Sequence, residues 1–399
     1  MSKNIVICCD GTGNEFGNRN SNVVKLYSTL VTDHDQIAYY HPGVGTMGAP
    51  TAKNWVERHW TQAKGLAFGA GLLDNVADAY RYLINHYSDG DRIFLFGFSR
   101  GAYTVRVLGG VLHKYGLLCA GNESHIPYVM RMYAQKRRAA GRGKQLVEND
   151  EQDNQFKWMF SRRPPVDLHF VGVWDTVSSV GWIYDPVKLP FTGTNPIIKN
   201  GRQAIAIDER RCFYMPLLWA EAPNIKQVWF TGVHSDVGGS YPENESELSK
   251  VTLEWMLQEA VQEGLRINRA KARCVLGKQP KCEPFLPDFV PGNPAAAIHP
   301  SLNGAWWLLE ALPHRYDATE NTGVRWRFPF GAFRRIPEGS RIYEPAIKRI
   351  PAKRLPRTYT LEPAVNFSPY FFEKELSFTA STSTKTAQQA FPLSRFKGV

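Results

Sequence analysis

The most constraining feature of this 399-residue sequence is an apolar run that leads directly into a Gly-x-Ser-x-Gly turn. The run covers residues 93–96, and the turn covers residues 97–101 with Ser99 at its centre. A continuous apolar run predicts a strand buried on both faces. Apolar residues at helical spacing over 102–112 predict a helix directly after the turn. Strand, sharp turn and helix in this order are the setting of a nucleophile elbow, so Ser99 is the candidate nucleophile.

The glycines of this turn have a steric role. Because the strand would enter the helix without spare residues, side chains at positions 97 and 101 would crowd Ser99, and glycine avoids the collision. The turn would expose the Ser99 hydroxyl above the strand ends. It would also point the amide of Arg100, at the start of the helix, toward an oxyanion formed there. The alternative interpretation is a tight turn in a Rossmann-like sheet.

Strand-like and helix-like segments alternate along the chain. This alternation predicts an α/β fold with a mostly parallel sheet and helices on both faces, and the elbow makes it α/β-hydrolase-like. In such a sheet, ligands bind at the C-terminal ends of the strands. The predicted strands cover 4–9, 36–41, 92–96, 166–174 and 224–233, and the predicted helices cover 22–30, 72–87, 102–112, 248–263 and 302–312.

Two regions interrupt the alternation. Residues 122–165 are too long for a plain connection and are interpreted as an insertion or cap, which leaves residues 1–121 and 166–315 as the hydrolase core. Residues 316–399 are rich in proline, aromatic and basic side chains. This composition suits a solvated lid and equally suits a region that contacts a membrane or a partner.

The formal net charge of +11 favours an anionic partner such as a phospholipid surface, although it also fits a charge that only keeps the protein soluble. No nucleic acid is expected as a partner. No apolar run is long enough to span a bilayer, and the chain begins in a strand without a signal peptide, so a cytoplasmic location is expected. The six scattered cysteines are interpreted as buried thiols of a reducing compartment.

A serine hydroxyl needs a base to accept its proton and a carboxylate to orient that base. In α/β-hydrolases these groups follow the serine in the order acid, then histidine. The preferred assignment uses Asp236, which follows a predicted strand, and His299. His299 would precede a helix capped by Ser301, and the positive end of that helix would favour the neutral imidazole that a base requires.

A second assignment fits the same order. Asp175 ends the strand over 166–174, and His234 ends the next predicted strand. In this case Asp236 would only cap turn amides, and His299 would be a loop residue. If the preferred assignment holds, Asp175 and His234 would instead line the pocket or orient the elbow.

The second oxyanion donor is expected from the loop after the first strand, at Gly11, Thr12 or Gly13, with Asp10 ordering that loop. A simple turn is the alternative there. No cofactor or metal is expected. The glycines of 43–48 match a dinucleotide fingerprint, but a proline two residues later blocks the helix that a nucleotide site needs.

Several ordered segments together resemble a known family. They are residues 10–14, 97–102, 173–177, 208–211, 232–239 and 298–302. They are similar to the bacterial and fungal "domain of unknown function" α/β-hydrolase family, which includes the first group of type VI secretion lipase effectors. The resemblance implies an α/β-hydrolase fold and, in the effector branch, phospholipase activity through a Ser-Asp-His triad. It places the nucleophile at Ser99 and the histidine at His299. Ser240 departs from the family, where glycine is frequent.

The expected function is therefore a serine hydrolase of carboxylic esters, most concretely an A-type phospholipase. The expected partners are a phospholipid or other acyl ester, a membrane surface, and a secretion-system or immunity protein. Delivery to a target cell without a signal peptide would follow from the effector branch. The alternative function is a catalytically silent hydrolase fold that binds a membrane or a secretion-machine partner.

Overall fold

The computed structural model describes residues 2–11, 17–43, 66–139, 151–177, 189–279, 283–317 and 324–364. Its main sheet has eight strands in the order β10-β9-β6-β5-β4-β3-β1-β2, and every pairing in it is parallel. The predicted α/β class is thereby confirmed. The strands are β1 (Asn4–Cys9), β2 (Gln36–His41), β3 (Arg92–Phe98), β4 (Leu168–Trp174), β5 (Gly201–Ala206), β6 (Ile225–Phe230), β9 (Arg341–Tyr343) and β10 (Thr360–Glu362). A separate antiparallel hairpin joins β7 (His314–Asp317) to β8 (Val324–Arg327).

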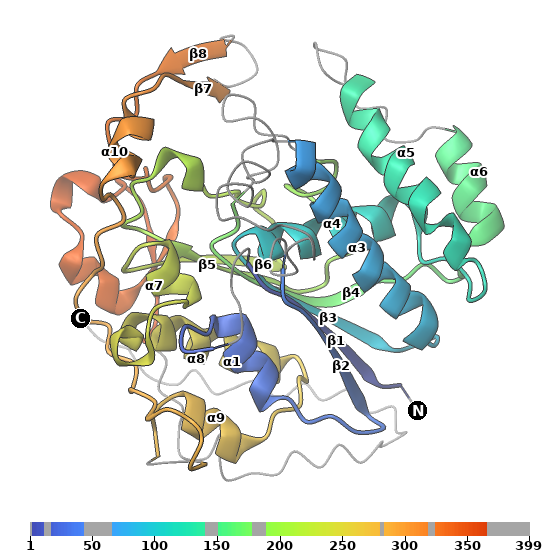
Figure 1. Ribbon diagram of the computed structural model, residues 1–399, viewed down its shortest axis with the longest axis horizontal. Helices are drawn as coiled ribbons and strands as arrows, with labels where there is room; N and C mark the ends of the chain where they lie inside the picture. Colours follow the sequence, from blue (N-terminus) through green and yellow to red (C-terminus); the bar gives the residue numbers. More distant parts are fainter. Residues whose placement is uncertain are drawn as a thin grey trace, which may run out of the picture. The chain divides into compact units, whose positions relative to one another are not determined.

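Helices cover both faces of the sheet (Figure 1). On one face, Ile5 and Ile7 of β1 share a core with Val76 of α3 and Val105 of α4. On the other face, Met256 of α8 packs so closely on Gly172 that a Cβ there would lie 2.6 Å from its sulfur. The longer helices are α1 (Asn22–Thr29), α3 (Leu66–His86), α4 (Arg100–Tyr115), α5 (Ile126–Ala139), α6 (Glu151–Phe160) and α8 (Glu247–Gln262); the shorter ones are α7 (His234–Gly238), α9 (Arg269–Val275) and α10 (Ala305–Glu310).

The predicted insertion, residues 122–165, contains α5 and α6. Tyr133 of α5 and Phe156 of α6 belong to the main hydrophobic core. Lys114 of α4 forms a buried ion pair with Asp153 of α6 at 3.0 Å. The described part of the insertion is therefore packed on the helical layer beside the sheet, as Figure 1 shows at α5 and α6. A role as a cap stays a prediction.

The main sheet continues beyond the expected core boundary at residue 315. Strand β9 pairs with β6, and β10 pairs with β9. The boundary is corrected for these two strands, which are too short and polar to show a strand pattern in the sequence. Strand β5 was also not predicted, because Arg202 and Gln203 interrupt its apolar run.

The cysteines fall into two chemical states. Cys8, Cys9, Cys119 and Cys212 are free thiols. Burial raises the pKa of Cys9 to about 12, so that thiol is unreactive at neutral pH. Cys274 is disulfide-bonded, so the interpretation of all six cysteines as thiols is wrong at this position. Among the described residues, no helix combines the length and apolar character needed to cross a bilayer.

Candidate active site

Ser99 occupies a strained turn between β3 and α4. Its backbone lies at φ 57° and ψ −122°, outside the regions that ordinary side chains prefer. A Cβ at Gly97 would lie 2.6 Å from the carbonyl oxygen of Gly101, and a Cβ at Gly101 would lie 2.1 Å from that of Cys9. Glycine is therefore required at both positions, as predicted, but the collisions it avoids are with backbone carbonyls of Gly101 and Cys9 and not with Ser99. Strain of this kind is typical of functional sites.

Two side chains extend a hydrogen-bonded chain from the serine. His234 Nε2 lies 2.8 Å from Ser99 Oγ, and His234 Nδ1 lies 2.5 Å from Asp175 Oδ2. The three side chains come from the turn after β3, the end of β4 and the first residue of α7, all at the C-terminal edge of the sheet. All three are buried. The arrangement has the geometry of a nucleophile, a base and an orienting acid.

The imidazole of His234 is fixed from several sides. The rings of Phe98 and Tyr214 contact it, each with a centroid distance of 4.7 Å. Its backbone amide donates to Glu209 Oε2 at 3.1 Å. Glu209 is held in turn by two hydrogen bonds from the guanidinium of Arg211, at 2.8 and 2.9 Å. Glu209 was not predicted as a site residue, although it lies in one of the segments that carry the family resemblance.

The electrostatics favour a neutral histidine next to an ionised acid. Burial lowers the pKa of His234 below its ordinary value, although Asp175 and Glu209 act in the opposite direction. Burial alone would raise the pKa of Asp175, but the charge of Arg334 and a hydrogen bond from His234 hold it well below its usual range. A neutral imidazole oriented by a carboxylate is the form that accepts a proton from a hydroxyl.

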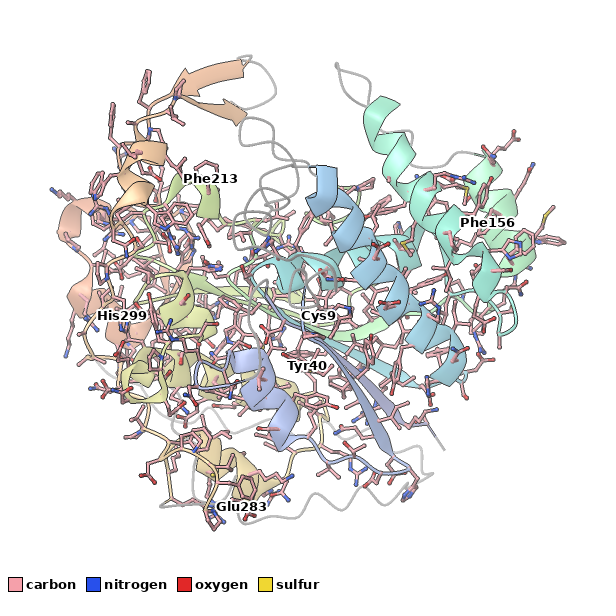
Figure 2. All side chains as sticks on the ribbon, viewed as in Figure 1. Cys9, Tyr40, Phe156, Phe213, Glu283 and His299 are labelled. Carbon is pink, nitrogen blue, oxygen red and sulfur yellow. The ribbon has the colours of Figure 1, made fainter. Side chains whose placement is uncertain are left out.

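His299 and Asp236 form a second pair next to α7. His299 Nδ1 lies 2.6 Å from Asp236 Oδ1, and its Nε2 lies 3.2 Å from Glu245 Oε2. The imidazole stacks on Tyr241 with a centroid distance of 3.8 Å. Asp236 Oδ2 also accepts a hydrogen bond from the amide of Val233, so Asp236 caps the first turn of α7. Figure 2 shows His299 beside this helix.

The preferred assignment of Asp236 and His299 is therefore corrected. The hydroxyl of Ser99 is engaged by His234, and both ring nitrogens of His299 are engaged by carboxylates. The physical reason lies in α7. His234 and Asp236 are two residues apart on the same helical turn, so their side chains leave it in different directions. The second assignment, with Asp175 and His234, is the one whose side chains meet at Ser99.

Asp10 forms hydrogen bonds at the described start of the loop after β1, and its ordering of the rest of that loop stays a prediction. Asp10 Oδ1 accepts from the Gly11 amide at 2.6 Å, and Asp10 Oδ2 accepts from Ser21 at 2.5 Å and Tyr40 at 3.0 Å. The Gly11 amide is thus already committed, and its assignment as the second oxyanion donor is corrected. Thr12 and Gly13 lie outside the described residues. Arg100 is the first residue of α4, as predicted, and its role as an oxyanion donor stays a prediction.

A group of possible metal ligands lies at the other end of the sheet. Within the described ranges, Asp33, His34 and Asp35 approach one another before β2 begins. Arg266 already binds Asp33 through two hydrogen bonds, at 2.6 and 2.8 Å. The charge of Asp33 is therefore compensated by an arginine.

Comparisons with known proteins point to one family. A family model for the catalytic domain of Tle1-like phospholipase effectors of the type VI secretion system matches residues 3–259. This range includes Ser99, Asp175 and His234 and ends before His299 and Arg334. An uncharacterized protein of Saccharomyces cerevisiae is 33% identical over 234 residues, which are 57% of this chain and 34% of that protein.

Two solved structures are similar at low identity. One is an uncharacterized protein from Pseudomonas aeruginosa, with a TM-score of 0.38 and 17% identity over 67% of this chain and 46% of that one. The other is the Tle1 effector bound to the VgrG spike of the type VI secretion system, with a TM-score of 0.32 and 20% identity over 62% of this chain and 52% of that one. The chain thus spans between 34% and 52% of the length of these three proteins.

Proposed function

This chain belongs to the family of Tle1-like type VI secretion phospholipase effector catalytic domains, and from that premise we propose that it is a serine hydrolase that cleaves acyl esters of phospholipids. The observation that carries the proposal is the hydrogen-bonded chain from Ser99 through His234 to Asp175 on a strained elbow. Release of a fatty acid from a glycerophospholipid, an A-type activity, is the reaction proposed. Delivery by a secretion machine rests on the family alone.

Acylation begins with attack of Ser99 Oγ on the ester carbonyl carbon. As the new C–O bond forms, His234 Nε2 takes the hydroxyl proton, and Asp175 stabilises the imidazolium through its bond to Nδ1. The carbonyl oxygen gains the negative charge, which the amide of Arg100 at the N-terminus of α4 stabilises. The imidazolium then returns the proton to the leaving alkoxide. The lysolipid departs as an alcohol, and the acyl group remains on Ser99.

Deacylation repeats the same chemistry with water. His234 accepts a proton from the water while its oxygen attacks the acyl carbon. Collapse of the tetrahedral intermediate breaks the bond to Ser99, whose oxygen takes the proton back from His234. The fatty acid leaves, and the site returns to its starting protonation state. The neutral imidazole favoured by the burial of His234 is therefore required twice in each cycle.

Active-site labelling tests the proposed nucleophile directly. A fluorophosphonate probe is expected to modify the wild-type protein once, on the peptide that contains Ser99, because only an activated serine attacks phosphorus at a useful rate. Peptide mass mapping identifies the site, and Ser99→Ala serves as the unlabelled control. Absence of label on wild type, both with and without phospholipid vesicles, would contradict the proposal and favour a silent binding module.

We also propose that the protein meets a phospholipid surface through an apolar patch next to the site. The patch consists of exposed side chains on and after α10, namely Trp307, Leu308, Phe328, Phe330 and Phe333. Leu308 is 74% exposed and Phe330 is 64% exposed. The guanidinium of Arg210 lies between two members, 4.8 Å from the ring centre of Phe333 and 5.7 Å from that of Trp307. Apolar rings interleaved with arginine suit the interface of an anionic bilayer.

Trp306, the residue before Trp307 of the apolar patch, links α10 to the candidate active site. Trp306 of α10 contacts Tyr214 at a centroid distance of 5.8 Å, and Tyr214 contacts the imidazole of His234. The backbone amide of Phe330 donates to the carbonyl of Glu310 at 3.1 Å, which ties the two halves of the patch together. A lipid surface seated on the patch would therefore lie close to the reacting groups.

Acidic substitutions in the patch test this contact. The double variant Leu308→Glu/Phe330→Glu is expected to lower hydrolysis of anionic phospholipid vesicles about tenfold, because it removes two apolar anchors and adds repulsion. Hydrolysis of a short, soluble ester should stay unchanged. Phe285→Glu, at a residue that is 81% exposed on the loop after α9, is the matched control. Equal vesicle hydrolysis by the double variant and the control would contradict the proposed surface.

A further inference from the structure

Arg334 reaches the acid of the candidate triad from a distant part of the chain. It follows β8 and lies outside residues 3–259, the range of the family match. Its guanidinium donates to both carboxylate oxygens of Asp175, from Nη1 to Oδ1 at 2.6 Å and from Nη2 to Oδ2 at 3.0 Å. It also donates to the backbone carbonyls of Ala206, at 2.9 Å, and Tyr214. A buried arginine with this set of acceptors is fixed in one orientation.

The carboxylate of Asp175 is fully engaged as a result. Oδ1 accepts from Arg334 and from the amide of Ala206, and Oδ2 accepts from Arg334 and from His234. Asp175 itself has a φ of 37°, in the left-handed region that side chains rarely adopt. The planar fork of arginine matches a carboxylate with two parallel hydrogen bonds, which lysine cannot reproduce. The plane of the Asp175 carboxylate, and with it the position of His234, is set partly by Arg334.

The segment that carries Arg334 is anchored three residues before it, at Gly331. Glu310 accepts from the amide of Gly331 at 3.2 Å, and Arg210 donates to the carbonyl of Gly331 at 2.7 Å. The neighbours of Arg334 face outward, since Phe333 is half exposed and Arg335 is exposed. Between these two exposed neighbours, the side chain of Arg334 turns inward.

We propose that Arg334 is a positioning residue of the catalytic centre, which holds the Asp175 carboxylate in the orientation that His234 needs. The inference rests on the proposed function. It extends the catalytic centre to Arg334, although the family's catalytic-domain model ends well before this residue. The segment that carries Arg334 also supplies Phe328, Phe330 and Phe333 to the apolar patch, so lipid contact and triad geometry share one stretch of chain.

Arg334 also influences the pKa of His234 through its positive charge. The charged or titratable groups around the imidazole are Asp175 and Glu209, which raise its pKa, and Arg334, which lowers it; Ser99 and Tyr214 contact it as well. Loss of the positive charge removes a lowering influence, so the pKa of His234 must rise. Because the base works only when neutral, the acid limb of the pH–rate profile must then move to higher pH.

The test measures kcat, KM and the pH profile with a short soluble ester. Arg334→Met is expected to lower kcat about 100-fold with KM changed little, because misplacement of a catalytic group costs on this order. Its acid limb should move up by roughly one pH unit. Arg334→Lys, which keeps the charge without the fork, should restore the acid limb but only part of kcat. Arg335→Met, at the exposed neighbour, is the matched control and should behave as wild type.

Two outcomes separate this inference from the proposed function. If wild type is inactive and unlabelled by the fluorophosphonate probe, the proposed function fails. If wild type is active and Arg334→Met or Arg334→Lys keeps the wild-type kcat and pH profile, the positioning role of Arg334 is overturned. If thermal unfolding shows that Arg334→Met is not folded, Arg334→Lys alone decides. A residue needed only for folding would leave the kcat of the folded Arg334→Lys protein unchanged.

Discussion

Replacement of His234 by alanine is expected to lower kcat by on the order of 10⁵-fold or more. His234 is the group that contacts Ser99 Oγ, at 2.8 Å, and without it the hydroxyl has no acceptor for its proton. Because His234 is buried, a water molecule is not expected to replace the imidazole as proton acceptor. Steady-state kinetics with a soluble ester and the rate of fluorophosphonate labelling both measure the loss. Thermal unfolding of the variant checks that the fold is kept.

His299→Ala is the matched control for that variant. Both residues are histidines paired with a buried aspartate at 2.5 to 2.6 Å, but only His234 contacts the serine. His299→Ala is expected to keep kcat within about tenfold of wild type. It should lose roughly 2 kcal/mol of stability, the usual value of a hydrogen bond to a charged group, because Asp236 is buried. Loss of labelling in His299→Ala with retention in His234→Ala would reinstate Asp236 and His299 as acid and base.

The elbow could be predicted because its signal is local. An apolar run, a Gly-x-Ser-x-Gly turn and a helical pattern follow one another without interruption, and each has one good structural interpretation. Strands β1 and β2 were predicted with the bounds that the structure has, for the same reason. The main sheet and its C-terminal edge follow from the alternation of such segments.

The partner of Ser99 could not be predicted in the same way. Two acids and two histidines follow strands or precede helices at one edge of the sheet, and both pairs satisfy the expected chain order. The choice depends on the direction in which the side chain of His234 points from α7. That direction is fixed by packing against Phe98 and Tyr214. Family resemblance pointed to the segment around residue 299. In the structure this segment binds α7 through the hydrogen bond between His299 and Asp236.

Arg334 illustrates a different limit of the sequence. It lies in a stretch with several arginines, and nothing in the pattern separates it from Arg335 next to it. What distinguishes Arg334 is burial against Asp175, a contact between residues far apart in the chain. Glu209 is equally hard to predict, because its role comes from the hydrogen bond that it accepts from the amide of His234. Residues that act through a triad member carry no local motif of their own.

Gly101→Ala is expected to destabilise the fold by roughly 3 kcal/mol, toward the upper end for overpacking of a buried site. A Cβ at this position would lie 2.1 Å from the carbonyl oxygen of Cys9 and 2.4 Å from that of Asp10. Both contacts are backbone atoms at the end of β1, which is paired with β2 on one side and β3 on the other. Strand β1 cannot move away without breaking its pairing with β2 or β3. The strain must therefore be taken up by the elbow itself.

The measurement is chemical denaturation of Gly101→Ala beside Gly193→Ala. A Cβ at Gly193 meets no atom within 4 Å, and its backbone is not left-handed, so that variant should stay within about 0.5 kcal/mol of wild type. Any shift of α4 also moves Ser99 relative to His234, so Gly101→Ala should lose activity even where it remains folded. A Gly101→Ala protein as stable and as active as Gly193→Ala would show that the close approach of α4 to β1 is not what holds the nucleophile in place.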